Sequence, residues 1–376
     1  MTGNRLLIDA SAGFNQGAGI GRYTREILRH SLPGLAESFE LSIWYASAGG
    51  THPPQKQEAL AAIPAELHRN IRRSLFSRRL IDRLERFSFQ IPQSWLANRS
   101  DIAYSPDFTL PGERSTGGMV TVHDLAFEII PEAYPAGLLH FLQAVVPKNI
   151  RRAERIGVVS RTTRIDVVER YNIPQDRVVV IPNAADQRFF DATPLQADRR
   201  SELGIPDDYL LAVGTIEPRK NYATLLDAQA IAFDATRRPL VIVGRSGWEN
   251  AAEMRRIREL EATGAVIPLL NASDADLPGL YAGAATLIYI PLYEGFGLPV
   301  VEAMAAGVPV ITSDIPTVRE VAAGKATVVP ARNVDEVAEA IRAIDSAAAI
   351  ATSDELRQAA RAYDWETSGG ILIETL

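Results

Sequence analysis

The sequence predicts an α/β protein of two domains, each built around an open parallel β-sheet. Short runs of apolar, β-branched residues alternate with helix-length stretches along most of the 376 residues. The runs are continuously apolar, which is typical of parallel strands that helices cover on both faces. A polar stretch with turn residues, 184–208, interrupts this alternation before a second series of strands begins. The length also agrees with two domains, at roughly 150 residues each.

The first series of apolar runs predicts an N-terminal domain over residues 1–185. A helix is expected over 21–31, directly after a glycine-rich stretch. The strands of this domain are expected at 6–8, 41–45, 102–104, 119–122, 156–159 and 178–181.

The second series predicts a C-terminal domain over residues 186–362. One helix, 299–306, has a proline near its start and Gly307 as its stop. From 363 to 376 the pattern is helical, and we expect this last helix to pack back on the N-terminal domain. The strands of the second domain are expected at 209–213, 240–243, 266–270, 286–290, 308–312 and 326–329.

The composition narrows the class of function. The chain is 47% hydrophobic and 23% charged, as in globular proteins, which excludes a disordered chain. It has no cysteine, which excludes a disulfide scaffold, cysteine-ligated zinc and a cysteine nucleophile. A net charge of −7 argues against nucleic acid as the main partner.

Ligands of open parallel sheets bind beyond the carboxyl ends of the strands, so the residues after each strand are candidates. In the N-terminal domain, a loop with Gly17, Gly19 and Gly21 enters a helix, where backbone N–H groups can approach an anion. A plain tight turn explains the loop equally well. The G-A-G-I-G spacing and the absence of a Walker lysine disfavour a dinucleotide-binding dehydrogenase and a P-loop kinase. His123 ends a strand and either contacts a ligand or bonds to backbone.

The C-terminal domain has two such loops. Arg219 and Lys220 follow its first strand, and they either converge on a diphosphate or form a solvated pair. After the strand 286–290 come Glu294, a Gly-Phe-Gly turn and a helix that carries Glu302. The loop and the helix dipole suit a phosphate, Glu294 suits sugar hydroxyls, and Glu302 suits the diol of a ribose. Alternatively, Glu302 complements the helix dipole and Glu294 is a surface charge. If the loop edges of the two domains face each other, they form a cleft for the ligand.

No metal site is expected. The histidines show no H-x-x-H or H-E-x-x-H spacing, and there are no cysteines to add to them.

These motifs together resemble the retaining GT-B glycosyltransferases of the glycosyl transferases group 1 family (family 4). The most specific are the E-x7-E segment from Glu294 to Glu302, the Ala-x-Gly-Val-Pro-Val that ends at Val310, and the segment 214–221. The resemblance implies two Rossmann-like domains that face each other across a cleft. It also implies a nucleotide-sugar donor on the second domain and a saccharide acceptor on the first.

The resemblance assigns a role to each candidate residue. Glu302 would bind the donor ribose, Arg219 and Lys220 the diphosphate, and His123 the donor sugar near the reacting carbon. Glu294 would bind the donor sugar and, with the amides of the turn, its phosphate. The turn residues are Gly295, Phe296, Gly297 and Leu298, and the glycine loop with Gly19 and Gly21 would line the junction with the acceptor. Transfer with retention, assisted by the leaving phosphate, needs no enzyme nucleophile, metal or cofactor. The chain departs from many members at Thr215, where they have arginine.

The stretch from His123 to Pro135 is most similar to mannosyltransferase-type members that use GDP-mannose. We therefore expect transfer of mannose to a glycan or a lipid-linked saccharide. Two alternatives stay open. One is a non-catalytic subunit that binds a nucleotide sugar, and the other is a GT-B-like phosphorylase or epimerase.

Arginines alternate with apolar residues between Arg69 and Phe87. The pattern indicates a basic amphipathic helix, which would suit contact with anionic lipid. A solvated arginine-rich helix that packs its apolar stripe on the N-terminal domain explains it equally well. There is no apolar run of about 20 residues and no signal-peptide pattern. We therefore expect a cytoplasmic protein, with a peripheral position at the inner face of the membrane as the alternative.

Overall fold

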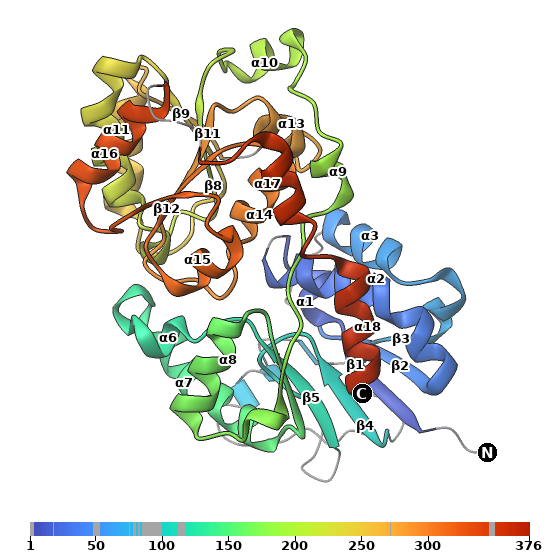
Figure 1. The fold of residues 1–376 in the computed structure, drawn as a ribbon. Helices are drawn as coiled ribbons and strands as arrows, with labels where there is room; N and C mark the ends of the chain where they lie inside the picture. The colour runs from blue at the N-terminus through green and yellow to red at the C-terminus, as the bar shows by residue number, and fades with distance from the viewer. Residues whose placement is uncertain are drawn as a thin grey trace. The chain divides into compact units, whose positions relative to one another are not determined.

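The computed structural model describes most of the chain, and the chain divides into two compact units (Figure 1). Unit 1 holds 1–128, 136–183 and 364–376, and unit 2 holds 129–135 and 184–363. The described residues are 4–17, 19–47, 53–74, 76–77, 80–81, 83–84, 100–111, 117–270, 272–345 and 350–376.

Unit 1 is built on a seven-stranded parallel sheet with the order β3-β2-β1-β4-β5-β6-β7. The six strands predicted for this half are present, each within two residues of its expected bounds, and β3 was not predicted. The chain builds this sheet outward from β1 in both directions, so the strand order reverses between β1 and β4. The bounds are β1 (Arg5–Asp9), β2 (Glu40–Tyr45), β3 (Ile71–Arg73), β4 (Ile102–Ser105), β5 (Gly117–Val122), β6 (Arg155–Val158) and β7 (Val178–Val180).

The helices α8 and α18 of unit 1 each begin at a residue whose side chain accepts from a backbone N–H of the first turn. Ser160 Oγ accepts from the N–H of Thr163 at the start of α8, and Asp364 accepts from the N–H of Thr367 at the start of α18. The α-helices are α1 (Ser11–Asn15), α2 (Ile20–Ser38), α3 (Pro53–Ala62), α6 (Ala126–Ile129), α7 (Ala136–Arg152), α8 (Arg161–Tyr171) and α18 (Trp365–Thr375).

The prediction of a helix from Arg69 onward is wrong over residues 69–73. A 3-10 turn, Ala65–Asn70, leads into β3, where Ile71 pairs with Ile43 of β2. Pairing with the edge of the sheet gives the backbone N–H and C=O groups of 71–73 their hydrogen bonds. The alternation of arginines and apolar residues alone could not reveal this pairing. Residues 75, 78–79, 82 and 85–87 of the stretch lie outside the described residues, and contact with anionic lipid stays a prediction.

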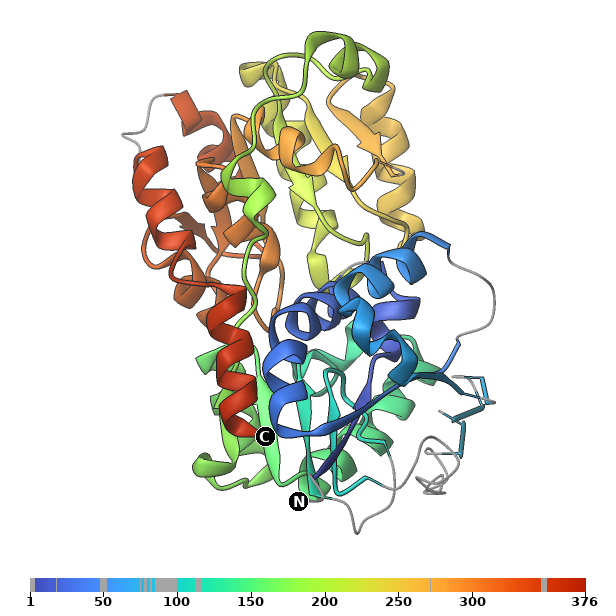
Figure 2. The same ribbon diagram turned by 90° about the vertical axis from the view of Figure 1, so that its right-hand side faces the viewer.

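The helix α18 lies alongside α2 within unit 1 (Figures 1 and 2). Trp365 is buried at the start of α18, with its ring 5.9 Å from that of Tyr23 on α2. Ser368 donates to the carbonyl of Pro182 at 2.8 Å. Gly369 packs against the backbone of His30, where a Cβ atom would lie 2.7 Å from the carbonyl oxygen.

Unit 2 is built on a six-stranded parallel sheet with the order β10-β9-β8-β11-β12-β13. All six predicted strands are present, and the order reverses between β8 and β11. The bounds are β8 (Leu210–Val213), β9 (Leu240–Val243), β10 (Val266–Leu269), β11 (Thr286–Tyr289), β12 (Val310–Ser313) and β13 (Thr327–Val329).

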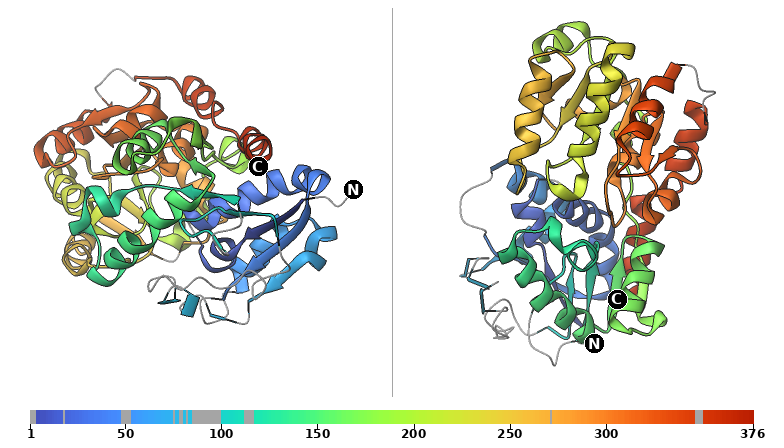
Figure 3. Two further views of the ribbon diagram at one scale, coloured as in Figure 1. Left: turned by 90° about the horizontal axis from the view of Figure 1, so that it is seen from below. Right: turned by 90° about the vertical axis from the view of Figure 1, so that its left-hand side faces the viewer.

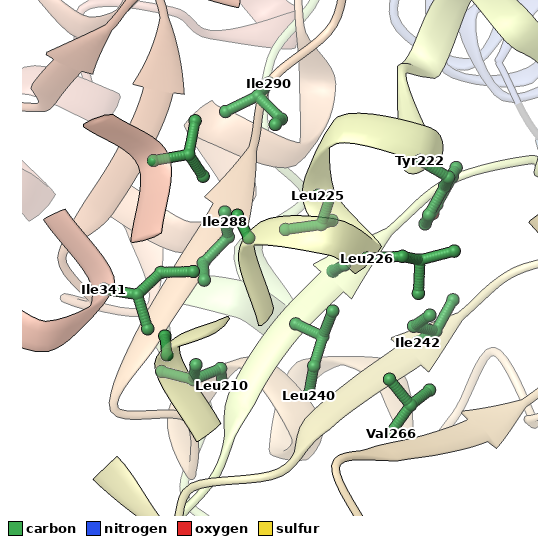
Figure 4. Close-up of a cluster of buried hydrophobic side chains, with 14 of the residues drawn as sticks. Leu210, Tyr222, Leu225, Leu226, Leu240, Ile242, Val266, Ile288, Ile290 and Ile341 are labelled. Carbon is green, nitrogen blue, oxygen red and sulfur yellow. The ribbon is translucent and has the colours of Figure 1, made fainter. Parts of the chain in front are cut away.

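Helices cover both faces of this sheet, as the continuously apolar strands predicted (Figure 3). On one face, α11, α12 and α16 enclose a core to which Leu226, Ile242 and Ile288 belong (Figure 4). The helices of unit 2 are α9 (Gln187–Phe190), α10 (Ala197–Leu203), α11 (Tyr222–Thr236), α12 (Ala251–Glu261), α13 (Leu277–Ala282), α14 (Leu298–Ala305), α15 (Pro316–Ala322), α16 (Val334–Arg342) and α17 (Ser353–Ala360).

Residues 129–135 precede α7 in the chain but group with unit 2. The indole N–H of Trp248 donates to the carbonyl of Ala133 at 2.9 Å, and its ring lies 5.9 Å from Tyr134. These residues lie within the range predicted for the N-terminal domain, so their grouping with unit 2 differs from the predicted domain bounds. Within the described parts of the chain, no helix has the length and apolarity needed to cross a membrane.

Two neighbouring glycines of α18 predict opposite effects on stability. Gly369→Ala forces a Cβ atom against the carbonyl of His30 and should lower the free energy of unfolding by about 1–3 kcal/mol. Gly370→Ala meets nothing within 4 Å and should raise it by up to about 1 kcal/mol through helix propensity. Thermal melting of the two variants and wild type tests this pair. Equal melting temperatures for both variants would show that α18 does not pack on α2 as described.

Candidate active site

The candidate site of unit 2 lies at the point where the strand order reverses. β8 and β11 are parallel neighbours, with Leu210 beside Thr286. The connections that leave their carboxyl ends go to opposite sides, and such a point is where open α/β sheets bind ligands. The backbone N–H of Leu292 donates to the carbonyl of Arg219 at 2.9 Å, so the two loops are tied together.

Four charged side chains meet there. Arg219 donates through Nη1 to Glu294 Oε1 at 2.7 Å and through Nη2 to Glu217 Oε1 at 2.9 Å. Lys220 Nζ donates to the same oxygen of Glu294 and to the hydroxyl of Tyr289, the latter at 2.8 Å. None of the four charged side chains is more than 13% exposed. Arg219, Lys220 and Glu294 are therefore a buried cluster rather than solvated loop charges.

Burial and the neighbouring charges shift the pKa values of this cluster. Burial lowers the pKa of Lys220 from its ordinary 10.5, although Glu294 opposes the shift. For Glu294, burial alone would raise the pKa, but Arg219 and Lys220 outweigh it and hold the pKa below the ordinary 4.5. Burial raises the pKa of Tyr289 well above 10. At neutral pH Glu294 is therefore a carboxylate and Tyr289 a neutral hydroxyl.

Glu217 and Tyr289 were not among the candidates from the sequence. Glu217 is only 4% exposed and lies two residues before Arg219. An acidic residue so close to two cations could have indicated an ion pair. Tyr289 ends a buried strand, where a side chain with a hydroxyl can reach the loop edge. Neither pattern is specific. Glu217 pairs with Arg219 two residues further on, whereas Tyr289 meets Lys220 from 69 residues away in the chain.

The turn after Glu294 leads directly into α14. Gly297 begins this helix with φ +94°, a conformation that favours glycine. Phe296 is buried edge-on against the ring of Tyr363, 5.2 Å between centroids. Glu302 follows on α14 and is only 2% exposed, and its Oε2 accepts from the hydroxyl of Tyr281 at 2.8 Å. The two carboxylates of the E-x7-E segment are thus both buried and hydrogen-bonded.

In unit 1, His123 follows β5 and is held on several sides. Its Nε2 lies 2.8 Å from the carbonyl of Pro106, which can only accept, so this nitrogen carries the hydrogen. The rings of Tyr23 and Phe108 lie edge-on to it at 4.8 and 5.8 Å. Burial lowers its pKa, and the charge of Asp107 opposes this only in part. The backbone bond considered from the sequence is present, and contact with a donor sugar stays a prediction.

The glycine loop of unit 1 is a tightly packed turn held by hydrogen bonds. Gly19 has φ +54° at the start of α2, and a Cβ atom at Gly21 would lie 2.1 Å from the carbonyl oxygen of Gln16. The guanidinium of Arg25, on the same helix, donates to the carbonyls of Gln16 at 2.7 Å and of Gly13 and Gly17. The local packing therefore requires glycine here, and what the loop binds stays a prediction.

Among the described residues, no three acidic or histidine side chains are grouped so that they could hold a metal ion.

Replacement of Glu294 should change both the stability of the protein and its dependence on pH. Glu294→Gln leaves Glu217 as the remaining carboxylate for two buried cations, so the free energy of unfolding at neutral pH should fall by about 1.5–3 kcal/mol. The folded-state pKa of Glu294 is depressed, so its contribution is complete above the ordinary 4.5 and is lost as the pH falls through the folded-state value. The difference between wild type and variant should therefore shrink on acidification.

Urea unfolding of wild type and Glu294→Gln over a range of pH measures this difference. Glu261→Gln, at an exposed position of α12, is the control and should stay close to wild type throughout. A difference that grows as the pH falls would contradict the ion cluster.

Two family models match the chain, one over each half. The model described as "Glycosyl transferases group 1" matches residues 196–363. The model described as "Glycosyltransferase Family 4" matches residues 17–189. The first match contains the buried cluster together with Glu302, and the second contains the glycine loop and His123.

Among curated proteins, the chain is 31% identical to the O-antigen chain mannosyltransferase B of Escherichia coli over 358 residues. This match covers 93% of each chain. It is 26% identical to the O-antigen chain mannosyltransferase RfbU of Salmonella typhimurium, over 64% of this chain and 67% of the relative.

Solved structures share the fold at low sequence identity. Anabaena HepE, crystallised with UDP and glucose, matches 99% of both chains with a TM-score of 0.71 and 17% identity. WaaG, a glycosyltransferase involved in lipopolysaccharide biosynthesis, matches 98% of both chains with a TM-score of 0.68 and 15% identity. Two parallel-sheet domains of this kind are the GT-B architecture. The chain therefore belongs to the glycosyl transferases group 1 family and is a glycosyltransferase of GT-B fold.

Proposed function

We propose that the protein is a retaining mannosyltransferase that moves mannose from GDP-mannose to a glycan or lipid-linked saccharide of a cell-surface polysaccharide. The observation that carries the proposal is the buried cluster of Arg219, Lys220 and Glu294 at the strand-order reversal of unit 2. Relatives described as O-antigen mannosyltransferases support the sugar and the type of product. The similarity of residues 123–135 to mannosyltransferase-type members supports GDP-mannose as the donor.

The cluster suits the diphosphate of such a donor. Arg219 and Lys220 are adjacent donors that converge on a single carboxylate oxygen, and phosphate oxygens would take the same hydrogen bonds. When a diphosphate replaces that carboxylate, Glu294 becomes available to accept from hydroxyls of the donor sugar. Glu302 would accept from the ribose, and the amides from Gly295 to Leu298 would approach the phosphate. One exchange of partners would thus prepare both the phosphate site and the sugar site.

In the proposed reaction, the bond between the anomeric carbon and the phosphate oxygen breaks, and the acceptor oxygen forms its bond to the same face of that carbon. The leaving phosphate takes the proton of the acceptor hydroxyl. Arg219 and Lys220 stabilise the charge that develops on the diphosphate, which is transition-state stabilisation of the kind that raises kcat. The scheme uses no enzyme nucleophile, metal or cofactor.

A thermal-shift panel with GDP, UDP, dTDP and ADP tests the donor first. A ligand at about 100 times its Kd adds roughly 2.7 kcal/mol of stability, and we expect GDP to give the largest shift. A larger shift with another nucleotide would overturn the assignment of GDP-mannose. Transfer from GDP-mannose, with the product anomer read by NMR and with EDTA present, then tests retention and independence of metal. Binding of donor without any transfer would favour the non-catalytic subunit.

Lys220→Ala should lower kcat more than it raises the KM for the donor, because the ammonium acts on charge that appears in the transition state. Lys325→Ala is the matched control, since Lys325 in the same unit pairs with Glu355 at the surface, 3.5 Å away. Steady-state kinetics with varied donor measures both constants. Unchanged kcat in a folded Lys220→Ala protein would place the chemistry elsewhere.

A further inference from the structure

Glu302 is held by a tyrosine that the sequence motif does not contain. Tyr281 lies on α13 and is fully buried, and its hydroxyl donates to Glu302 Oε2 at 2.8 Å. The helix α13 packs against α14, which carries Glu302. A buried carboxyl group is costly unless polar groups bond to it, so this hydrogen bond offsets part of the cost of burying Glu302.

The ring of Tyr281 is itself fixed in place. It packs edge-on against the ring of Phe189 on α9, with 5.5 Å between centroids and 79° between planes. A tyrosine side chain turns about only two torsions, and burial removes both freedoms. The hydroxyl is therefore presented to Glu302 from a rigid base.

We propose that Tyr281 is the positioning residue that orients the Glu302 carboxylate toward the ribose hydroxyls of the donor nucleotide. A carboxylate offers about four acceptor positions, so acceptance from one hydroxyl does not exhaust its capacity. The bond to Oε2 selects one orientation of the carboxylate plane, which the diol then meets without reorganisation of the protein. The inference rests on the proposed function, in which Glu302 binds the ribose.

This arrangement predicts that Tyr281 contributes to the discrimination between ribose and deoxyribose. A carboxylate that is oriented for two hydroxyls loses a bond when the 2′-hydroxyl is missing. A carboxylate that lacks this bond is less restricted in orientation and recovers part of that loss by contacts in other orientations. Loss of the Tyr281 hydroxyl should therefore weaken the binding of the ribonucleotide more than that of its 2′-deoxy form.

Tyr281→Phe removes only the hydroxyl, and the chain offers a matched control. Tyr209 is also buried in unit 2, at 1% exposure, and its hydroxyl donates to the carbonyl of Leu280 at 2.7 Å. Tyr209→Phe thus removes one buried hydroxyl and one hydrogen bond, to the residue before Tyr281 on α13, without touching Glu302. Both variants should lose similar thermal stability.

Calorimetric titrations with GDP, UDP and ADP and their 2′-deoxy forms test the proposal, on the ribonucleotide that wild type binds most tightly. Tyr281→Phe should raise the Kd of that ribonucleotide about fivefold to tenfold and bring the ratio of deoxy to ribo Kd close to one. Tyr209→Phe should leave both Kd values within about twofold of wild type. If Tyr281→Phe keeps the wild-type ratio of deoxy to ribo Kd, the positioning role is overturned. The hydrogen bond then only connects α13 to α14.

Glu302→Gln separates this inference from the proposed function. If Glu302→Gln loses the ribose preference and Tyr281→Phe keeps it, the positioning role fails and the ribose site stands. If Glu302→Gln binds like wild type, or if wild type binds none of the nucleotides, the ribose site itself is wrong and the inference falls with it.

Discussion

The shared carboxylate of Glu294 is the interaction on which the arrangement of unit 2 depends. Two cations from the loop after β8 converge on one carboxylate from the loop after β11. A buried charge is tolerated only when it is paired, and Glu294 pairs with both Arg219 and Lys220, while Glu217 gives Arg219 a second carboxylate. The two loops can meet because β8 and β11 are parallel neighbours whose connections leave in opposite directions. The strand order thus brings the two loops together, and the ion cluster connects them.

The carboxylates of the E-x7-E segment are both held by partners from elsewhere in the unit, and each lies beside a buried tyrosine. Tyr289 contacts Lys220 next to Glu294, and Tyr281 bonds to Glu302. Rigid aromatic side chains at both carboxylates lower the reorganisation that a ligand would demand. The groups that bond to the two carboxyl groups differ in charge. Glu294 accepts from two cations, Arg219 and Lys220, and Glu302 accepts from the neutral hydroxyl of Tyr281.

In unit 1 the candidate residues are held by hydrogen bonds to backbone carbonyls, whereas the buried cluster of unit 2 is held by ion pairs. His123 is oriented by the carbonyl of Pro106, and the glycine loop is held by Arg25 through three backbone carbonyls. The loop before α2 and the residues around Pro106 follow β1 and β4, the two strands between which the order of this sheet reverses. The glycine loop and Pro106 thus lie beyond the two strands at the reversal, whereas His123 itself follows the neighbouring strand β5.

From the sequence alone one could predict the fold class, twelve of the thirteen strands among the described residues, and the segments that hold Arg219, Lys220, Glu294 and Glu302. These features are local, because apolar runs, helix stops and closely spaced motif residues are read within short stretches of chain. The strand order, the strand β3 in place of a helix, and the partners of the charged residues became clear only from the three-dimensional fold. Arg219 and Glu294 are 75 residues apart, and Tyr281 and Glu302 are 21 apart on different helices. No periodicity joins such pairs, since their proximity depends on which strands pair and where each helix packs.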